Sequence, residues 1–477
     1  MSLKTKVMHG FGWLAGANFV GQLLTWVMTI VIMRLLSPSD YGLLAMASIF
    51  VALLAMLAAA GLGPAIVQST AIDEQKLKQL FSVIMMVNAV LTLSLMAAAP
   101  AIAAFFNEPR LTDVVRVLSL QFVISAFAVV PEALLARALK FKARAFIDLT
   151  ANVSGGVATL WLAYSGYGVW SLVAGSTLTV LGKSIGLNLV SPYVRWPGLS
   201  VAGLKPLLAY GGNVTASRIL WFFYSQADIF IAGKLLGKET LGFYSVAMHL
   251  ASLPVQKLSG MLNQVAFPAF AQIQQDPGLV ARHVLKAVRI LGFFAFPVLW
   301  GISSIAPELV RLVLGAKWEL AILPLQILPL VMPFRMISNF LPAAVDAVGR
   351  PDISVKNLVT ASVIMPLSFV VGSQYGVAGL SMSWVVAFPL VFLANLHRSL
   401  PALALRMKPF LGTLAKPAFA GAAMYGAVWA TGLALPADTH AVARIALMIG
   451  AGAITYGGLS LITNRAGCNE ILQLVRR

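Results

Sequence analysis

Long apolar runs recur along the whole of this 477-residue chain, and they limit its possible folds more than any single motif does. A helix needs about 20 consecutive apolar residues to cross the hydrocarbon core of a bilayer. Hydrophobic residues make up 59% of the chain and charged residues only 10%, whereas soluble domains carry about 25% charged residues. Because so few charges cannot cover a water-facing surface, the sequence predicts an all-α integral membrane protein.

Fourteen apolar runs are long enough to be transmembrane helices. The connections between them are too short to hold a separate extramembrane domain. The predicted spans lie near residues 10–33, 41–67, 80–106, 114–136, 145–164, 167–189, 206–233, 241–267, 285–305, 319–346, 354–372, 376–396, 415–433 and 441–462.

Lysine and arginine fall unevenly on the two sides of these spans. Twenty-two of the 34 basic residues lie in segments on the side of the N-terminus, and eight lie on the opposite side. Basic residues are retained in cytoplasmic loops, so the distribution predicts that both termini are cytoplasmic. It also accounts for most of the net charge of +18 without a nucleic-acid partner.

The chain contains an internal repeat with an offset of about two hundred residues. Several positions of the first hairpin match the seventh and eighth spans, and a Tyr-Gly-Val sequence before the sixth span recurs before the twelfth. The matched positions are Gly12 with Gly212, Leu36 with Leu236, Gly42 with Gly242, Ala47 with Ala247, and Tyr167 with Tyr375.

The repeated unit contains six spans, an even number, so the two copies have the same orientation in the membrane. Such copies are related by an axis along the membrane normal and form two parallel lobes. The sequence therefore predicts an N-terminal six-helix lobe over 1–195, a C-terminal six-helix lobe over 196–400, and two extra transmembrane helices with a cytoplasmic tail over 401–477.

Two features together point to a known family: the arrangement of six, six and two spans, and the sequence Leu-Leu-Ser-Pro-Ser-Asp-Tyr-Gly at 35–42 after a glycine-rich first helix. The chain resembles the polysaccharide flippase branch of the multidrug/oligosaccharidyl-lipid/polysaccharide exporter superfamily, and it is similar to the Wzx-type exporters of colanic acid and related exopolysaccharides. The resemblance covers nearly the whole chain, most closely residues 1–270. It implies two lobes around a V-shaped cavity that move an undecaprenyl-diphosphate-linked oligosaccharide across the bacterial inner membrane by alternating access. A polysaccharide polymerase is a further partner that it suggests.

Four basic residues lie deep inside predicted spans, where each costs about 2.5–3.5 kcal/mol if it faces lipid. A lipid diphosphate needs cations to cross this zone, and the guanidinium fork matches phosphate oxygens. We therefore expect Arg218 and Arg335 to contact the diphosphate or acidic sugars, and Lys183 and Lys257 to add positive potential. Local pairing with acids, or extension of the lysines to the headgroups, is the alternative.

Asp228 is the clearest carboxylate deep in a span, and Ser225 precedes it by three residues on the same helix face. The resemblance extends to lipid II flippases, which hold sodium with an aspartate of the seventh span and residues of the eleventh and twelfth. It implies that Asp228, Ser225 and Asn357 couple transport to a cation, but Ala361 stands where a second acid would help. Na⁺, H⁺ and transport without coupling all remain open, as does a structural pairing of Asp228 with Lys257. No cofactor and no other metal site are expected.

Three other functions fit the sequence less well. A multidrug or cation antiporter would place acids in the N-terminal lobe, yet the interiors of the first two predicted spans contain none. A membrane enzyme such as a polysaccharide polymerase would need catalytic groups on a large outer loop, which the predicted topology lacks. A lipid II flippase stays open as an alternative.

Overall fold

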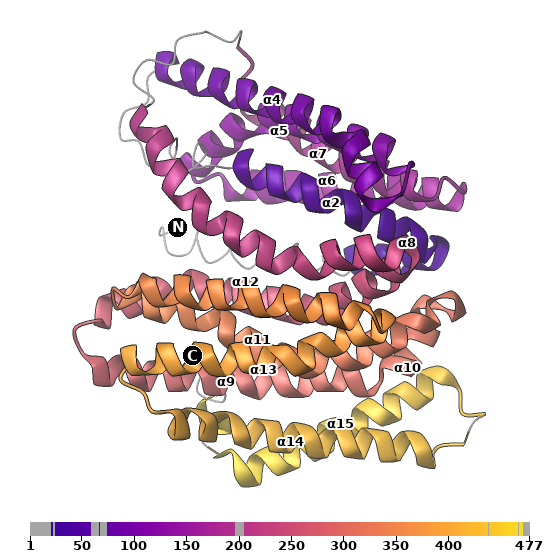
Figure 1. Ribbon diagram of the computed structural model, residues 1–477, viewed down its shortest axis with the longest axis vertical. Helices are drawn as coiled ribbons and strands as arrows, with labels where there is room; N and C mark the ends of the chain where they lie inside the picture. The colour runs from indigo at the N-terminus through magenta and orange to yellow at the C-terminus, as the bar shows by residue number, and fades with distance from the viewer. Residues whose placement is uncertain are drawn as a thin grey trace, which may run out of the picture. The chain divides into compact units, whose positions relative to one another are not determined.

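The computed structural model describes residues 21, 24–58, 66, 74–195, 205–436, 438–465 and 467–470. Side chains of 205–218, 257–258 and 260–265 lie outside this description, although their backbone is helical. The described chain is helical from end to end, with short turns and no strand (Figure 1). The predicted all-α class is therefore confirmed.

The chain divides into two compact units. The first holds the described residues up to Phe222 together with the short segment Gly237–Gly242, and the second holds Phe223–Leu236 and the described residues from Phe243 onward. The predicted division into two six-helix lobes and two extra helices, with boundaries at residues 195 and 400, remains a prediction.

Antiparallel helices make up most of the first unit. Neighbours in the chain pack side by side, most extensively α6 against α7 and α4 against α5, and α5 also packs on α7. The helices are an unlabelled one at Leu24–Leu35, α2 (Pro38–Ala58), α4 (Glu74–Phe106), α5 (Leu111–Arg137), α6 (Phe141–Tyr164) and α7 (Val169–Val190).

The second unit is likewise built from antiparallel helix pairs. Helix α12 packs on α13, α14 on α15, and α11 on both α9 and α13. Its elements are α9 (Pro277–Ser304), α10 (Ala306–Leu309), η1 (Val310–Leu314), η2 (Ala316–Ala321), α11 (Ile322–Ala347), α12 (Pro351–Ser373), α13 (Gly376–Ala402), α14 (Met407–Ala434) and α15 (Ala441–Thr463).

Helix α8 (Lys205–Ile273) runs through both units and is broken at Gly237. Gly237 has φ 78° and ψ 175°, a conformation that glycine adopts at little cost. The break falls between the predicted spans 206–233 and 241–267.

Side-chain caps show why the first labelled helix begins where it does. The Ser37 hydroxyl donates to Asp40 Oδ2 at 2.6 Å, and the same oxygen accepts from the Ser37 backbone N–H at 3.0 Å. The Asp40 N–H in turn lies 3.3 Å from Ser37 Oγ, which completes a reciprocal capping box. Pro38 supplies the first helical residue, where its missing N–H costs nothing. Part of the Leu35–Gly42 motif is thus a helix start signal.

The duplicated hairpins cross each other through glycine. A Cβ on Gly42 would lie 1.7 Å from the carbonyl oxygen of Lys238, and a Cβ on Gly242 would lie 1.8 Å from the carbonyl oxygen of Pro38. The two contacts are reciprocal, because position 38 corresponds to 238 and position 42 to 242. Only glycine allows the two backbones to approach so closely. The glycines matched by the repeat therefore form one tight crossing within the first unit.

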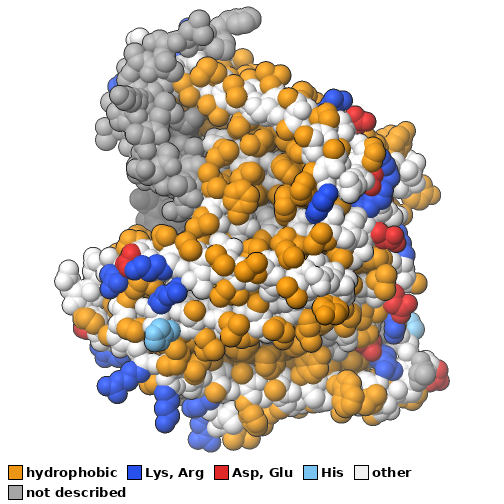
Figure 2. Space-filling model, viewed as in Figure 1, with side chains coloured by type: hydrophobic (Ala, Val, Ile, Leu, Met, Phe, Trp, Pro, Cys, Tyr) orange, Lys and Arg blue, Asp and Glu red, His pale blue; other side chains and the backbone are white. Residues whose placement is uncertain are grey.

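Eleven helices among the described residues are long and apolar enough to cross a membrane, and Leu24–Leu35 is a shorter apolar helix. One of the eleven, Ile219–Gln256, contains the break at Gly237 and so covers parts of two predicted spans. Hydrophobic side chains cover much of the face seen in Figure 2, and charged side chains gather toward the ends of the second unit's helices. These features support a multi-pass membrane protein, and the count of fourteen stays a prediction.

Candidate functional site

A buried chain of polar side chains surrounds Asp228 in the second unit. The Tyr244 hydroxyl donates to Asp228 Oδ2 at 2.7 Å, and the Trp384 indole N–H donates to the Tyr244 oxygen at 2.8 Å. The backbone N–H of Ile229 donates to the other carboxylate oxygen at 2.9 Å. Asp228, Tyr244 and Trp384 are 2%, 0% and 1% exposed. Both arms of α8 and helix α13 thus meet at one carboxylate.

Asp228 is the hydrogen-bond acceptor at both of its carboxylate oxygens. The indole of Trp384 can only donate, so it occupies a lone pair of the Tyr244 oxygen and leaves the tyrosine proton for Asp228. Each oxygen of Asp228 then accepts one hydrogen bond. Asp228 thereby connects the two arms of α8 and, through Tyr244, helix α13.

Arg335 lies beside these hydrogen-bonded side chains, at the middle of α11. Its guanidinium carbon stands 4.4 Å from the centre of the Trp384 ring, the geometry of a cation–π contact. Its Nη1 atom lies 4.0 Å from the sulfur atoms of Met248 and Met332. The guanidinium also interacts electrostatically with Asp228. Arg335 and Asp228, predicted as separate sites, therefore belong to one cluster.

Arg335 has no paired acid among the described residues. Among the residues that the structure describes, no carboxylate lies within ion-pair distance of its guanidinium. The side chain is half-buried at mid-helix, where an uncompensated charge is expensive in a membrane. The aromatic face of Trp384 offsets only part of that cost. The arrangement leaves hydrogen-bond donors available to an anionic ligand.

Asn357 lies far from Asp228. Its side-chain amide donates to Asn395 Oδ1 at 2.7 Å and to Ser399 Oγ at 3.1 Å. Asn395 follows Trp384 by eleven residues in α13, about 16 Å along the helix axis. The expected set of Asp228, Ser225 and Asn357 is therefore not assembled, because the two ends of α13 hold its members apart. Ser225 stands half-buried, three residues before Asp228.

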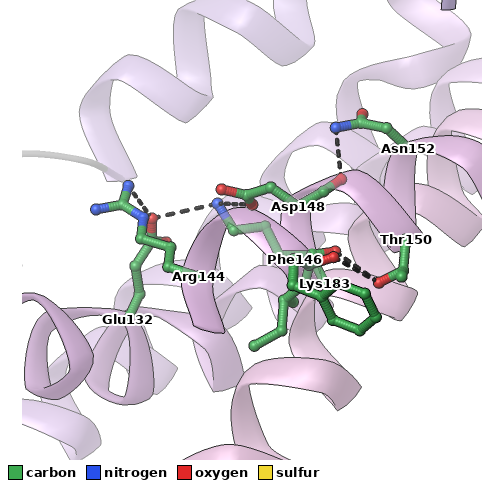
Figure 3. A network of polar contacts seen from close by, with 8 residues as sticks. Glu132, Arg144, Phe146, Asp148, Thr150, Asn152 and Lys183 are labelled. Carbon is green, nitrogen blue, oxygen red and sulfur yellow. Dashed lines mark hydrogen bonds and ion pairs between the residues drawn. The ribbon is translucent and has the colours of Figure 1, made fainter. Parts of the chain in front are cut away.

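Lys183 of α7 lies in an ion-pair network of the first unit (Figure 3). Its ammonium is 3.2 Å from Glu132 Oε1 and 3.2 Å from Asp148 Oδ1. Arg144 forms an ion pair with the same oxygen of Glu132. Helices α5, α6 and α7 thus bring together two cations and two anions. The local pairing considered for Lys183 is present, and it balances the lysine's charge.

The two remaining predicted cations, Arg218 and Lys257, fall on parts of α8 whose side chains lie outside the described residues. Their proposed contacts with the substrate, and the pairing of Asp228 with Lys257, stay predictions.

The family model described as "Polysaccharide biosynthesis protein" matches residues 31–323, more than half of the chain. The chain belongs to this family. Among its relatives, the lipopolysaccharide biosynthesis protein WzxC of Escherichia coli is 27% identical over 420 residues, which are 87% of this chain and 83% of WzxC. The teichuronic acid biosynthesis protein TuaB of Bacillus subtilis is 26% identical over 406 residues, 83% of each chain.

The fold of this polysaccharide biosynthesis protein is also found in a solved structure. An inward closed conformation of the lipid II flippase MurJ superposes with a TM-score of 0.73 and 14% identity, covering 95% of this chain and 99% of that one. At this identity the likeness concerns the fold alone. The resemblance to polysaccharide flippases of the exporter superfamily is thus confirmed by the family match and the relatives.

Sequence reasoning missed Tyr244 and Trp384 as partners of Asp228. Tyr244 lies sixteen residues after Asp228, and the break at Gly237 folds the chain back so that the two meet. A turn flanked by two apolar arms was visible in the sequence, so the meeting of the arms could have been expected. Trp384 comes from a helix 140 residues further on, and nothing in its local sequence indicates the contact.

Proposed function

We propose that this protein is a flippase that moves undecaprenyl-diphosphate-linked oligosaccharide repeat units across the bacterial inner membrane for exopolysaccharide or lipopolysaccharide synthesis. The family membership and the names of its relatives support a role in building surface polysaccharides. Long apolar helices and a fold like that of a lipid flippase support transport within the membrane. A transport role also fits better than an enzymatic one.

The observation that carries this proposal is Arg335. A half-buried guanidinium at mid-helix, with no carboxylate partner among the described residues, suits a ligand that brings its own negative charge. A diphosphate does so, and its oxygens match the guanidinium fork. A cationic drug would be repelled at this position, which disfavours the antiporter alternative.

Transport would proceed by alternating access of two six-helix lobes, with two further helices at the C-terminus. The internal repeat, including the reciprocal crossing at Gly42 and Gly242, supports two related halves. Fourteen spans place both termini in the cytoplasm, as the distribution of basic residues favours. A polysaccharide polymerase acting on the exported units is a further partner that this function would require.

Asp228 would couple transport to a cation, and its surroundings favour H⁺ over Na⁺. Sodium needs several oxygen ligands, whereas both oxygens of Asp228 already accept hydrogen bonds from N–H and O–H donors. A proton requires only that one of these bonds be exchanged. Protonation would also remove the negative charge of Asp228 from the surroundings of Arg335. The coupling site and the substrate site would therefore influence each other's affinity.

Deletion of the gene in its own host tests the transport function. We expect undecaprenyl-diphosphate-linked repeat units to accumulate, as measured by mass spectrometry of extracted lipids, and surface polysaccharide to fall. Expression of the wild-type chain should restore both, whereas Arg335→Gln should not. Accumulation of lipid II instead would establish the peptidoglycan alternative. If neither lipid accumulates, the flippase proposal is wrong.

A further inference from the structure

The cations of the Glu132 network have more hydrogen-bond donors than the network uses. Within the part of the chain that the structure describes, Arg144 has Glu132 as its one ion-pair partner, and both Arg144 and Lys183 reach the same oxygen of Glu132. A guanidinium carries several N–H donors and can bind two oxygens side by side. Arg144 can therefore accept a further anion.

The network lies toward one end of helices α5, α6 and α7. Lys183 comes seven residues before the end of α7, and Asp148 seven residues after the start of α6, about 10 Å along each helix axis. Glu132 and Arg144 lie nearer to the same ends of their helices. Helices α6 and α7 have 24 and 22 residues, about 36 and 33 Å, close to the thickness of a hydrocarbon core of about 30 Å. The four charges therefore lie within about 10 Å of the same ends of these helices, the ends at which the phosphates of a lipid would enter the membrane span.

The charged side chains can be reached from outside the unit. Their exposed fractions range from 25% for Glu132 to 39% for Arg144. Two exposed lysines, Lys140 and Lys142, stand at the turn between α5 and α6 at this end of the helices. They add positive potential that attracts anions to the network. By the predicted topology this is the cytoplasmic end, from which a lipid-linked precursor is loaded.

We propose that Arg144 and Lys183 form a loading site for the diphosphate of a polyprenyl diphosphate, and that Glu132 and Asp148 occupy these cations until the diphosphate replaces them. The proposal rests on the flippase function and adds a separate site, in the first unit, to the central Arg335. The carboxylates make the site reversible. With the two acids present the exchange is nearly balanced in charge, so the diphosphate binds without being trapped at the start of its path.

Removing a cation and removing an anion from the network should therefore have opposite effects on diphosphate binding. Loss of Arg144 or Lys183 removes donors from the diphosphate and weakens its binding. Loss of Glu132 removes the competing anion, so it strengthens binding and slows release. A network that only stabilises the fold would show no such opposition, because removal of either partner leaves an uncompensated charge.

Binding of undecaprenyl diphosphate to the purified full-length protein in nanodiscs tests the proposal, with undecaprenol and inorganic pyrophosphate as the other two probes. We expect Arg144→Gln and Lys183→Gln each to weaken undecaprenyl diphosphate binding about tenfold, as loss of one charge-assisted hydrogen bond implies. Glu132→Gln should tighten it and lower the transport rate. Undecaprenol should bind equally to all variants. If pyrophosphate competes with undecaprenyl diphosphate, the site recognises the phosphate groups alone. If pyrophosphate does not compete, the site also needs the lipid chain.

Arg311→Gln is the matched control, because Arg311 forms an exposed ion pair with Glu319 elsewhere in the chain. It removes one positive charge and should leave binding unchanged. If Lys183→Gln proves unstable, the double variant with Glu132→Gln removes one cation and one anion together and should bind more weakly than Glu132→Gln alone. The proposal would be overturned if the double variant bound as tightly as Glu132→Gln alone and Arg144→Gln bound as wild type does. Equal weakening by every variant, including Glu132→Gln, would also overturn it. If the wild-type protein does not transport the lipid-linked repeat unit in cells, the flippase function itself would be overturned.

Discussion

Tyr244 holds Asp228 from the far side of a broken helix: its hydroxyl lies 2.7 Å from Asp228 Oδ2, although sixteen residues and the break at Gly237 separate the two. The bond joins the arms of α8, and the indole of Trp384 extends it to α13. Movement of either arm must stretch or exchange this bond. The state of one carboxylate is thereby tied to the geometry of three helical segments.

Tyr244→Phe should uncouple these segments. The change leaves Asp228 Oδ2 and the Trp384 N–H without their partner, and each unsatisfied buried group costs about 1–3 kcal/mol. We expect a lower thermal unfolding temperature and a transport rate that responds less to pH. Transport by reconstituted protein, measured across a pH series, checks the second effect. Phe243→Leu, one residue earlier, is a control for packing in the same helix and should leave the pH response as in wild type.

Asp228→Asn and Asn357→Ala should differ in their effects. Asp228→Asn keeps the shape of the side chain and removes its charge, so we expect transport to be lost and the fold to be retained. Asn357→Ala removes hydrogen bonds to Asn395 and Ser399, far from the carboxylate. It should lower stability by about 1–3 kcal/mol and leave cation coupling intact. A matching loss of Na⁺-dependent transport in both variants would restore a shared sodium site.

Arg335→Lys should recover only part of the activity that Arg335→Gln abolishes. A lysine keeps the charge but loses the planar fork and its stacking on Trp384. We expect transport to fall about tenfold in the lysine variant, the loss of one strong hydrogen bond. Transport rates divided by the amount of folded protein give the comparison. Equal rates in Arg335→Gln and wild type would show that the guanidinium does not touch the substrate.

Gly42→Ala and Gly242→Ala should each disrupt the crossing of the duplicated hairpins. A methyl group at either position would overlap a backbone carbonyl, which cannot move aside as a side chain can. We expect a clear loss of thermal stability and of transport in both variants. Gly426→Ala in α14 is the control, because a Cβ there meets no atom within 4 Å. Alanine favours a helix over glycine by about 1 kcal/mol, so this variant should be at least as stable as wild type. Wild-type behaviour of Gly42→Ala would show that the crossing opens easily.

The sequence predicts the helical membrane fold and the internal repeat, because each rests on composition or on a local pattern. Apolar runs require helices in a bilayer whatever their neighbours are. The clusters of charges depend instead on contacts between distant helices. Asp228 and Arg335 were each visible as buried charges, but their meeting through Trp384 is set by the packing of α8, α11 and α13. Lys183 was expected to be available, and only the fold shows Glu132 and Asp148 beside it.

The reciprocal contacts of Gly42 with Lys238 and of Gly242 with Pro38 have the form of an isologous interface, in which one patch meets its own copy across a two-fold axis. If each half were a separate chain, this crossing would join two identical subunits, and one glycine codon would have served both contacts. Duplication and fusion of such a chain would separate that codon into two. The crossing is therefore consistent with an ancestor that worked as a homodimer of six-helix chains, whose two interface glycines can now change independently.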